Sequence, residues 1–267
     1  MAIKQFIYKY TNNGYGLNDA QNLAAQEIII RKIAASRLSE HVTLKGGIVM
    51  YNLTKSDRRV TQDIDFDFIS YSIDRESIHQ FISRLNKDND GFEISIVGKI
   101  EELHQDDYQG VRVNIVIKDV ESDKLHLKLD IGVHTYKAIP QDKILFCFDT
   151  NDTGISIKAN PLQQVFAEKL LSLAKLGAAS TRYKDIYDFY YLIKQCGISH
   201  LDVKEILLLF LSKRTKTPRT IDDLKTRIIK VLNNPRFERR IILSKSRWVE
   251  VEYDELKATI LDFVTLL

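Results

Sequence analysis

The sequence predicts an α+β fold in which a head built on a mixed β-sheet is followed by an all-helical C-terminal domain. Apolar and polar residues alternate with the period of a β-strand before about residue 150, whereas apolar residues spaced three or four apart dominate after Pro161. Glycine and proline are sparse, at 11 and 4 of 267 residues, so long helices are expected. Strands followed by helices are typical of this class. We therefore expect one domain over 1–155 and a second over 156–267.

The elements of the head follow from local patterns. Asn18 or Asp19 can cap a first helix that reaches about Ser39. Asp74 can cap a later helix that ends near Asn86. The other elements expected in the head are strands at 42–44, 63–69, 92–99, 110–118, 124–133 and 144–148, with a short helix at 48–53. The segment 134–160 is otherwise expected to be rich in loops.

After Pro161 the apolar residues recur with helical period. The helices expected here cover 161–177, 182–196, 201–213, 219–233 and 250–265.

The composition is that of an ordinary globular protein. Apolar residues make up 44% and charged residues 28%, which excludes a disordered or collagen-like chain. Cys147 and Cys196 are the only cysteines, so neither a zinc motif nor a disulfide framework is readable. The first ten residues do not resemble a signal peptide, and no apolar run is long enough to cross a membrane. A reducing, cytoplasmic setting without membrane contact is expected.

Charge is distributed unevenly along the chain. Residues 1–150 carry 19 basic and 22 acidic side chains, whereas residues 204–247 carry 13 basic and only 4 acidic ones. We call the segment 204–247 the basic block. Such a block favours a phosphate-rich partner, or else it is the solvated face of helices.

Two carboxylates mark the strand at 63–69. Asp63 and Asp65 are two residues apart and therefore point to the same face, while Ile64 and Phe66 point to the other. Paired carboxylates on one face suit a hard divalent cation, Mg²⁺ or alternatively Mn²⁺. Asp67 is either a third member of this set or its solvent-facing end. A pair of this kind also occurs by chance on ordinary solvent-facing strands.

A third carboxylate and a glycine turn add to this pattern. Asp130 ends a strand whose leucines alternate, so it lies beside Asp63 and Asp65 if the two strands are neighbours; three such carboxylates would suit two-metal phosphoryl transfer. Gly46 and Gly47, between a strand and a helix, offer backbone N–H groups to phosphate oxygens. A plain strand-to-helix turn is the alternative. The loop that follows holds Arg58 and Arg59, which are natural phosphate neighbours.

Charged residues also interrupt two of the C-terminal helices. Lys169 lies on the apolar stripe of the helix at 161–177, and Asp185 shares an apolar face with Phe189. A lysine in that place must be paired, extend to solvent or face a cleft. Lys169 therefore either binds a nucleotide phosphate or pairs with Asp185 across two helices, and Arg182, three residues before Asp185, is an alternative partner of that aspartate. Asp188 caps or braces the same site.

These motifs in this order resemble those of a known family. The run Leu44-Lys45-Gly46-Gly47, then Arg59, then Thr61-Gln62-Asp63-Ile64-Asp65-Phe66 is similar to the head of polymerase-β-like nucleotidyltransferases, and specifically to AbiEii-type toxins of type IV toxin–antitoxin systems. The later lysine of that family matches Lys169, and its late aspartate-bearing helix matches Asp185 and Asp188. The resemblance covers about residues 40–195. Gly47 stands where many nucleotidyltransferases have serine, which leaves phosphate contact there to the backbone.

The resemblance implies a Mg²⁺-dependent nucleotidyltransferase that transfers a nucleotide from NTP to an RNA acceptor, of which tRNA is a known class, and that is neutralised by an antitoxin. Catalytic roles are expected for Asp63, Asp65, Asp130, Lys169 and Asp185, and nucleotide-binding roles for Gly46, Gly47, Arg59, Lys169 and Asp188. Asp63, Asp65 and Asp130 would hold the metal, and the helical domain would complete the nucleotide cleft.

Two other functions stay open at this point. One is a nucleotidyltransferase that modifies a small molecule such as an antibiotic, against which the basic block argues. The other is a non-catalytic module that binds nucleotide or nucleic acid, against which the full set of acidic residues argues.

Overall fold

The computed structural model describes residues 2–105, 108–148 and 153–267. The chain forms two compact units, Met1–Asn160 and Pro161–Leu267. The boundary expected from the sequence lies a few residues earlier, because the last strand of the sheet was not anticipated.

The first unit contains one mixed sheet of eight strands in the order β3-β5-β6-β2-β1-β8-β7, with β4 also pairing with β5. The strands are β1 (Val42–Lys45), β2 (Asp63–Phe68), β3 (Phe92–Ile96), β4 (Glu101–Gln105), β5 (Tyr108–Asp119), β6 (Lys124–Val133), β7 (Asp142–Phe146) and β8 (Ile155–Ala159). The pairs β2–β6 and β1–β8 are parallel, and the others are antiparallel. The expected mixed sheet is confirmed.

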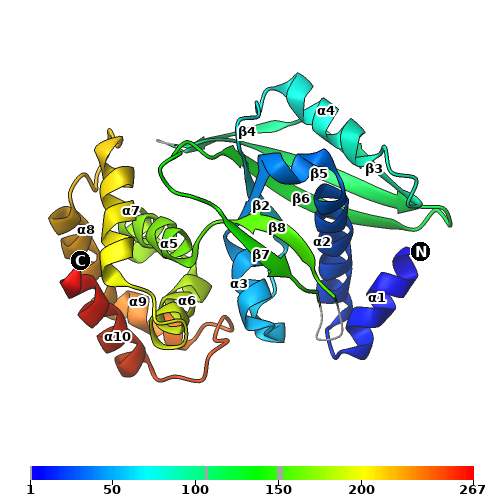
Figure 1. Cartoon of the computed structure of the whole chain (residues 1–267). Coiled ribbons are helices and arrows are strands. Elements are labelled where there is room, and N and C mark those ends of the chain that lie inside the picture. Colours follow the sequence, from blue (N-terminus) through cyan, green and yellow to red (C-terminus); the bar gives the residue numbers. More distant parts are fainter. Residues whose placement is uncertain (1, 106–107, 149–152) are drawn as a thin grey trace. The chain divides into compact units, whose positions relative to one another are not determined.

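One face of this sheet is apolar and is covered by two helices. Figure 1 shows α2 (Leu17–Ala35) lying along the sheet and α4 (Arg75–Leu85) near β3. Phe66 and Phe68 of β2 are essentially buried and contact the ring of Phe81 of α4 at 5.7 and 5.1 Å between centroids. Because side chains alternate along a strand, burying this face turns the aspartates of β2 toward the opposite face.

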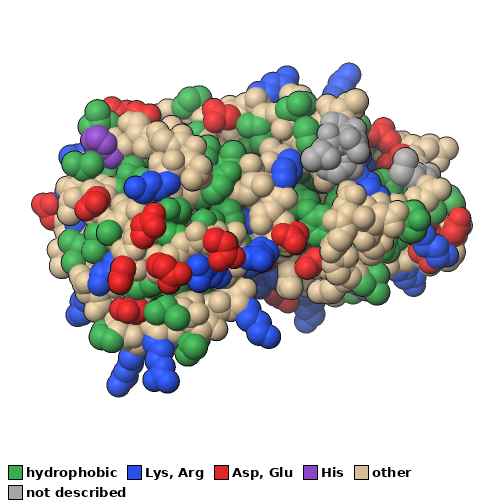
Figure 2. Space-filling model, turned by 90° about the horizontal axis from the view of Figure 1, so that it is seen from below, with side chains coloured by type: hydrophobic (Ala, Val, Ile, Leu, Met, Phe, Trp, Pro, Cys, Tyr) green, Lys and Arg blue, Asp and Glu red, His purple; other side chains and the backbone are tan. Residues whose placement is uncertain are grey.

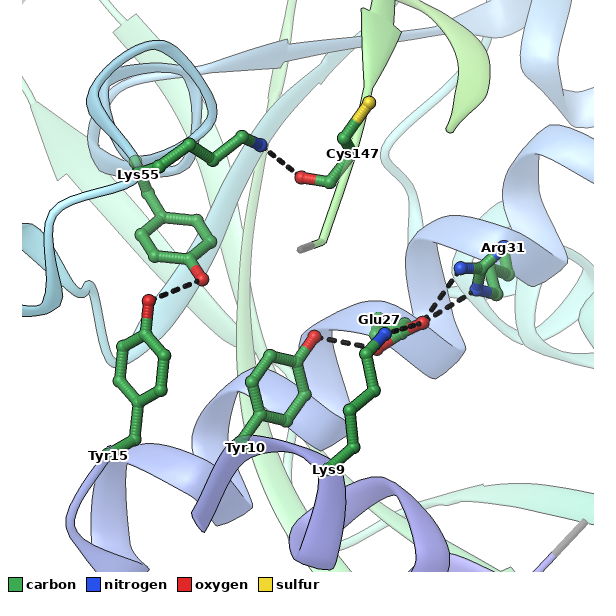
Figure 3. A network of polar contacts seen from close by, with 8 residues as sticks. Lys9, Tyr10, Tyr15, Glu27, Arg31, Lys55 and Cys147 are labelled. Carbon is green, nitrogen blue, oxygen red and sulfur yellow. Dashed lines mark hydrogen bonds and ion pairs between the residues drawn. The ribbon is translucent and has the colours of Figure 1, made fainter. Parts of the chain in front are cut away.

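The N-terminal helix α1 (Ile3–Asn12) is attached to α2 by a buried carboxylate. Glu27 is 2% exposed and accepts hydrogen bonds from Lys9, Tyr10 and Arg31, as Figure 3 shows. Asp119 at the end of β5 accepts a further bond from the backbone N–H of Ile3. A buried carboxylate needs such partners to offset its lost hydration, so this cluster fixes α1 to the head.

Three shorter elements complete the head. They are η1 (Arg37–His41), α3 (Gly47–Thr54) between β1 and β2, and η2 (Asp57–Arg59) just before β2.

The second unit is entirely helical in the part of the chain that is described. Its helices are α5 (Leu162–Leu176), η3 (Gly177–Ala179), α6 (Tyr183–Lys194), α7 (His200–Ser212), α8 (Ile221–Leu232), α9 (Pro235–Ile242) and α10 (Tyr253–Leu266). Phe166 of α5 is fully buried and contacts the rings of Phe189 and Phe263, each at 4.8 Å. This aromatic cluster ties α6 and α10 to α5.

Most expected elements are confirmed, but four were missed: α1, β4, β8 and α9. Helix α1 carries a readable pattern, since Ile3, Phe6 and Tyr10 are buried at helical spacing. The expected cap of α2 at Asn18 or Asp19 is wrong, because the N-cap is Gly16, two or three residues earlier. The prediction for 144–148 identified one strand of what is a β7–β8 hairpin.

Within the described residues, no helix is both long enough and apolar enough to cross a membrane.

Candidate active site

The predicted carboxylates lie on the face of the sheet opposite α2 and α4. Asp65 of β2 is the register partner of Asp130 of β6 and also of Lys45 of β1. Arg112 of β5 is the register partner of Asp130 on the other side. Register partners in neighbouring strands point to the same face, so four charged side chains form one row across four strands.

Asp63 lies in the next row along the same face. Its Oδ1 accepts a hydrogen bond from the Thr61 hydroxyl at 3.1 Å, and its Oδ2 is 3.0 Å from Nζ of Lys128, its register partner on β6. The backbone carbonyl of Thr61 accepts in turn from the buried amide of Gln26 of α2 at 2.7 Å. The start of β2 is thus held in place from the helix behind it.

Both oxygens of Asp130 are engaged by one guanidinium. Arg112 donates from Nε to Oδ1 and from Nη2 to Oδ2, each at 2.8 Å. This bidentate geometry is the strong form of a charge-assisted pair. Donating these hydrogen bonds to Asp130 raises the pKa of Arg112.

Asp67 is a separate case. It is 4% exposed, and its Oδ1 lies 2.5 Å from Nζ of Lys45. Asp67 is therefore not a solvent-facing end of the acidic face, which was one of the two interpretations open from sequence.

Two glycines bring the backbone of the β1–α3 turn close to these carboxylates. Gly46 has φ +66°, and a Cβ placed on it would lie 2.7 Å from Oδ2 of Asp65. A Cβ on Gly47 would lie 2.8 Å from the hydroxyl oxygen of Thr61. Neither position has room for a side chain, so a serine at 47 would clash with Thr61. Gly46 is therefore favoured by its positive φ and Gly47 by the lack of space beside Thr61.

The two arginines before β2 differ in exposure. Arg59 is 3% exposed at the end of η2, whereas Arg58 is exposed. Contact between Arg59 and a phosphate stays a prediction.

In the helical unit, Lys169 of α5 pairs with two aspartates of α6. Its ammonium contacts Oδ1 of Asp185 and lies 3.0 Å from Oδ2 of Asp188. The three residues are 8%, 9% and 0% exposed. The sequence left two interpretations of Lys169 open, and the structure contains the pair with Asp185. A role of these three residues toward nucleotide stays a prediction.

The family of this chain follows from a comparison with known protein families. The profile of the nucleotidyl transferase AbiEii toxin family, of type IV toxin–antitoxin systems, matches residues 28–265. This chain belongs to that family. The match covers both units and extends well beyond the residues that carried the resemblance in the sequence. The chain is therefore a nucleotidyltransferase of the kind that forms the toxin of a toxin–antitoxin system, as the resemblance implied.

The other comparisons add little. A crystal structure of an antigenic nucleotidyltransferase-like protein from Paracoccidioides brasiliensis is similar at 14% identity and a TM-score of 0.36, over 70% of this chain and 84% of that one. That likeness is too weak to carry an argument. The search of curated proteins returned no match.

The donor set of the AbiEii-family head fits a divalent cation by its chemistry. Asp63, Asp65 and Asp130 supply hard oxygen ligands on one face of neighbouring strands. Among the described residues, however, no three His, Cys, Asp or Glu side chains converge closely enough to hold a metal as they stand. Asp63 and Asp130 are instead paired with Lys128 and Arg112. Asp63 and Asp130 fit a metal once Lys128 and Arg112 release them.

The basic block is spread over several elements of the helical unit. Arg239 and Arg240 of α9 are exposed, as is Lys213 at the end of α7, whereas Arg227 of α8 pairs with Asp223 at 2.7 Å. Figure 2 shows acidic and basic side chains lying next to one another on the face in view. Asp223 therefore neutralises one charge of the basic block, whereas Arg239 and Arg240 on α9 form an exposed basic pair.

Sequence reasoning missed Arg112, Lys128, Thr61 and Gln26 as parts of the site. For Lys128 there was a readable indication, since it shares a strand face with Asp130 two residues on. For Arg112 there was none, because its contact with Asp130 depends on the pairing of β5 with β6.

Proposed function

We propose that this AbiEii-family chain is a Mg²⁺-dependent nucleotidyltransferase (Mn²⁺ being the alternative metal) that transfers a nucleotide from NTP to a tRNA-like RNA acceptor in the cytoplasm. The observation that carries the proposal is the register of the sheet, which sets Asp65 beside Asp130 on the face that Asp63 shares. Family membership supplies the reaction class, and this face supplies the acidic centre that such a reaction requires.

Asp63 and Asp65 would hold the metal, joined by Asp130. When bound, the cation supplies neutralisation of the charge that develops on the transferred phosphoryl group. Asp130, the register neighbour of Asp65, would also act as base toward the attacking hydroxyl. Thr61 and Gln26 hold Asp63 in place through the two bonds described above.

The triphosphate would be held mainly by backbone groups. Gly46 and Gly47 open α3, and helix N-termini present N–H groups with a partial positive charge to phosphate oxygens. The close approach of Gly46 to Asp65 brings this turn next to the proposed metal ligands. Arg59 is proposed as an additional phosphate contact.

Lys169, Asp185 and Asp188 are proposed to take part in nucleotide binding. An ammonium is a compact point charge that suits a phosphate oxygen. Lys169→Ala would then weaken NTP binding by about 1.5–3 kcal/mol, the size of a charge-assisted contact.

An RNA acceptor is supported by the basic block and by its exposed Arg239 and Arg240. An antitoxin partner is supported by the family to which the chain belongs. Neither the base of the NTP nor the identity of the antitoxin follows from these features.

The test is incubation of the purified chain with each labelled NTP, Mg²⁺ and total RNA. Labelled tRNA is the expected product. If a small molecule from a cell extract is labelled instead, the acceptor is that small molecule and not RNA. If no product forms with any NTP or extract, the chain is a non-catalytic binding module.

Two variants and a control connect this activity to the carboxylate face. Asp63→Asn and Asp65→Asn should each abolish turnover while the protein stays folded, since each removes one anionic ligand. Asp142→Asn changes an exposed aspartate on the edge strand β7 in the same unit and should leave turnover unchanged. Full activity in both Asp63→Asn and Asp65→Asn would reject this site.

A further inference from the structure

Two basic side chains hold the carboxylates that the proposed metal needs. Arg112 takes both oxygens of Asp130, and Lys128 lies 3.0 Å from Oδ2 of Asp63. Each comes from a strand adjacent in the sheet to that of its carboxylate partner. This face of the sheet therefore carries basic side chains beside the carboxylates to which a metal ion would bind.

These two pairs differ from the third pair on the same face. The side chains of Arg112 and Lys128 are 34% and 36% exposed, whereas those of Lys45 and Asp67 are 13% and 5% exposed. The carboxylate partners Asp130 and Asp63 are 16% and 28% exposed, so water partly re-solvates the charges when either pair separates. The bidentate Arg112–Asp130 pair costs more to separate than Lys128–Asp63. Separating a buried pair leaves charges without that compensation. Arg112 and Lys128 can thus exchange partners, while Lys45–Asp67 stays fixed.

We propose that Arg112 and Lys128 are positioning residues that pair with the carboxylates of the proposed metal site before substrate binds and pass to the triphosphate when a metal–nucleotide complex binds. The proposal rests on the proposed function, because it assumes that Asp63, Asp65 and Asp130 hold the metal. No covalent step is involved: two ion pairs within the protein are exchanged for two between protein and nucleotide.

Charge balance explains why the metal should arrive together with the nucleotide. A bare divalent cation has to displace Arg112 and Lys128 and then remain beside them, which places like charges together. A triphosphate still carries net negative charge after binding one divalent cation, so it offers the released side chains new partners. The two cations therefore weaken binding of free metal and strengthen binding of the metal–nucleotide complex.

The test measures Mn²⁺ binding to the full-length chain without nucleotide, by electron paramagnetic resonance and calorimetry. Arg112→Gln and Lys128→Gln should each bind free Mn²⁺ about tenfold more tightly than the unsubstituted chain, since a charge-assisted contact is worth at least that factor. The same variants should bind Mn²⁺ with a non-hydrolysable NTP analogue about tenfold more weakly. Arg112→Lys keeps the charge but cannot make the bidentate contact with Asp130, so both affinities should fall between those of Arg112→Gln and the unsubstituted chain.

Matched controls lie on the same strands and the same face. Lys118 on β5 and Lys124 on β6 are exposed and are register partners of each other at the far end of the hairpin. Lys118→Gln and Lys124→Gln remove the same charge without touching a carboxylate of the site, so they should change neither affinity by more than about twofold. Melting curves with and without Mn²⁺ show that each variant is folded.

Two results would overturn the inference. One is unchanged affinity for free Mn²⁺ in both Arg112→Gln and Lys128→Gln. The other is an equal gain in the two control variants, which would make the effect one of net charge. Failure of the proposed function itself gives a different pattern: Asp63→Asn and Asp65→Asn would then leave Mn²⁺ binding unaltered.

Discussion

Replacing Lys169 by methionine tests whether its buried ion pairs stabilise the helical unit. The substitution keeps the length of the side chain and removes the ammonium that contacts Asp185 and Asp188. All three residues are at most 9% exposed, so water cannot replace the lost partner. Removing one member of a buried pair costs about 3–5 kcal/mol, which is a large share of the 5–15 kcal/mol that is usual for a folded domain.

The single tryptophan allows this loss to be measured in the correct unit. Trp248 is 7% exposed and its ring lies 5.2 Å from that of Tyr191 of α6. Its fluorescence therefore reports unfolding of the helical unit. In urea, with a slope of about 2 kcal/mol per M, a loss of about 4 kcal/mol lowers the midpoint by about 2 M.

Two further variants make the prediction specific. Lys194→Met changes an exposed lysine in the last turn of α6 and should alter stability by less than about 0.5 kcal/mol. Adding Asp185→Asn and Asp188→Asn to Lys169→Met should restore part of the loss, because neutral amides no longer leave charge in a buried site. A midpoint for Lys169→Met equal to that of Lys194→Met, or no recovery in the triple variant, would refute the reasoning.

Three other substitutions have expected outcomes. Gly46→Ala should destabilise the head by about 1–3 kcal/mol and displace Asp65, since its φ is +66° and a Cβ would lie 2.7 Å from Oδ2; Gly14→Ala, at φ +88° with open space, isolates the backbone contribution. Asp74 caps α4, and hydrogen bonds from Ser72 and Ser77 lower its pKa from 3.8 to about 2. The stability that the unsubstituted chain gains over Asp74→Ala should therefore be complete above about pH 4 and shrink as the pH falls toward 2. The difference in melting temperature between the two proteins, measured at pH 6 and at pH 2.5, checks this. Replacing Arg239 and Arg240 by glutamate should weaken RNA binding without changing NTP affinity. The slope of log affinity against log salt concentration should become shallower by about 0.7 for each lost phosphate contact with single-stranded RNA. An RNA affinity that does not depend on salt would show that these two arginines are only part of a solvated surface.

Much of the fold was predictable because its determinants are local. Alternating leucines mark β6, the carboxyl group of Asp74 caps α4, and the change of period after Pro161 marks the helical unit. Of the elements that were missed, α1 carries a readable pattern, whereas β4, β8 and α9 are short. Strand β8 is five residues long and α9 has eight, and elements of that length are defined mainly by what they pack against.

The candidate site was predictable only in part, for a related reason. Asp63 and Asp65 are neighbours on one strand, so their shared face follows from the period of the strand alone. Lys169 was recognisable as unusual because a charge interrupts its apolar stripe, yet its partners were not fixed by that observation. Both interpretations of Lys169 were consistent with the sequence, and the packing of α5 against α6 selected the ion pairs.

The sequence by itself determined the class of fold, the acidic face of β2, the glycine turn before it and the family to which these motifs belong. The tertiary structure alone decided which charges meet. Strand β6 pairs with β2 although the two are far apart in the chain, and β5 follows β6 in the sheet. That order brings Lys128 to Asp63 and Arg112 to Asp130. The physical reason is that strand order and register depend on non-local backbone pairing, and shifting the register by one residue turns every side chain of a strand to the other face.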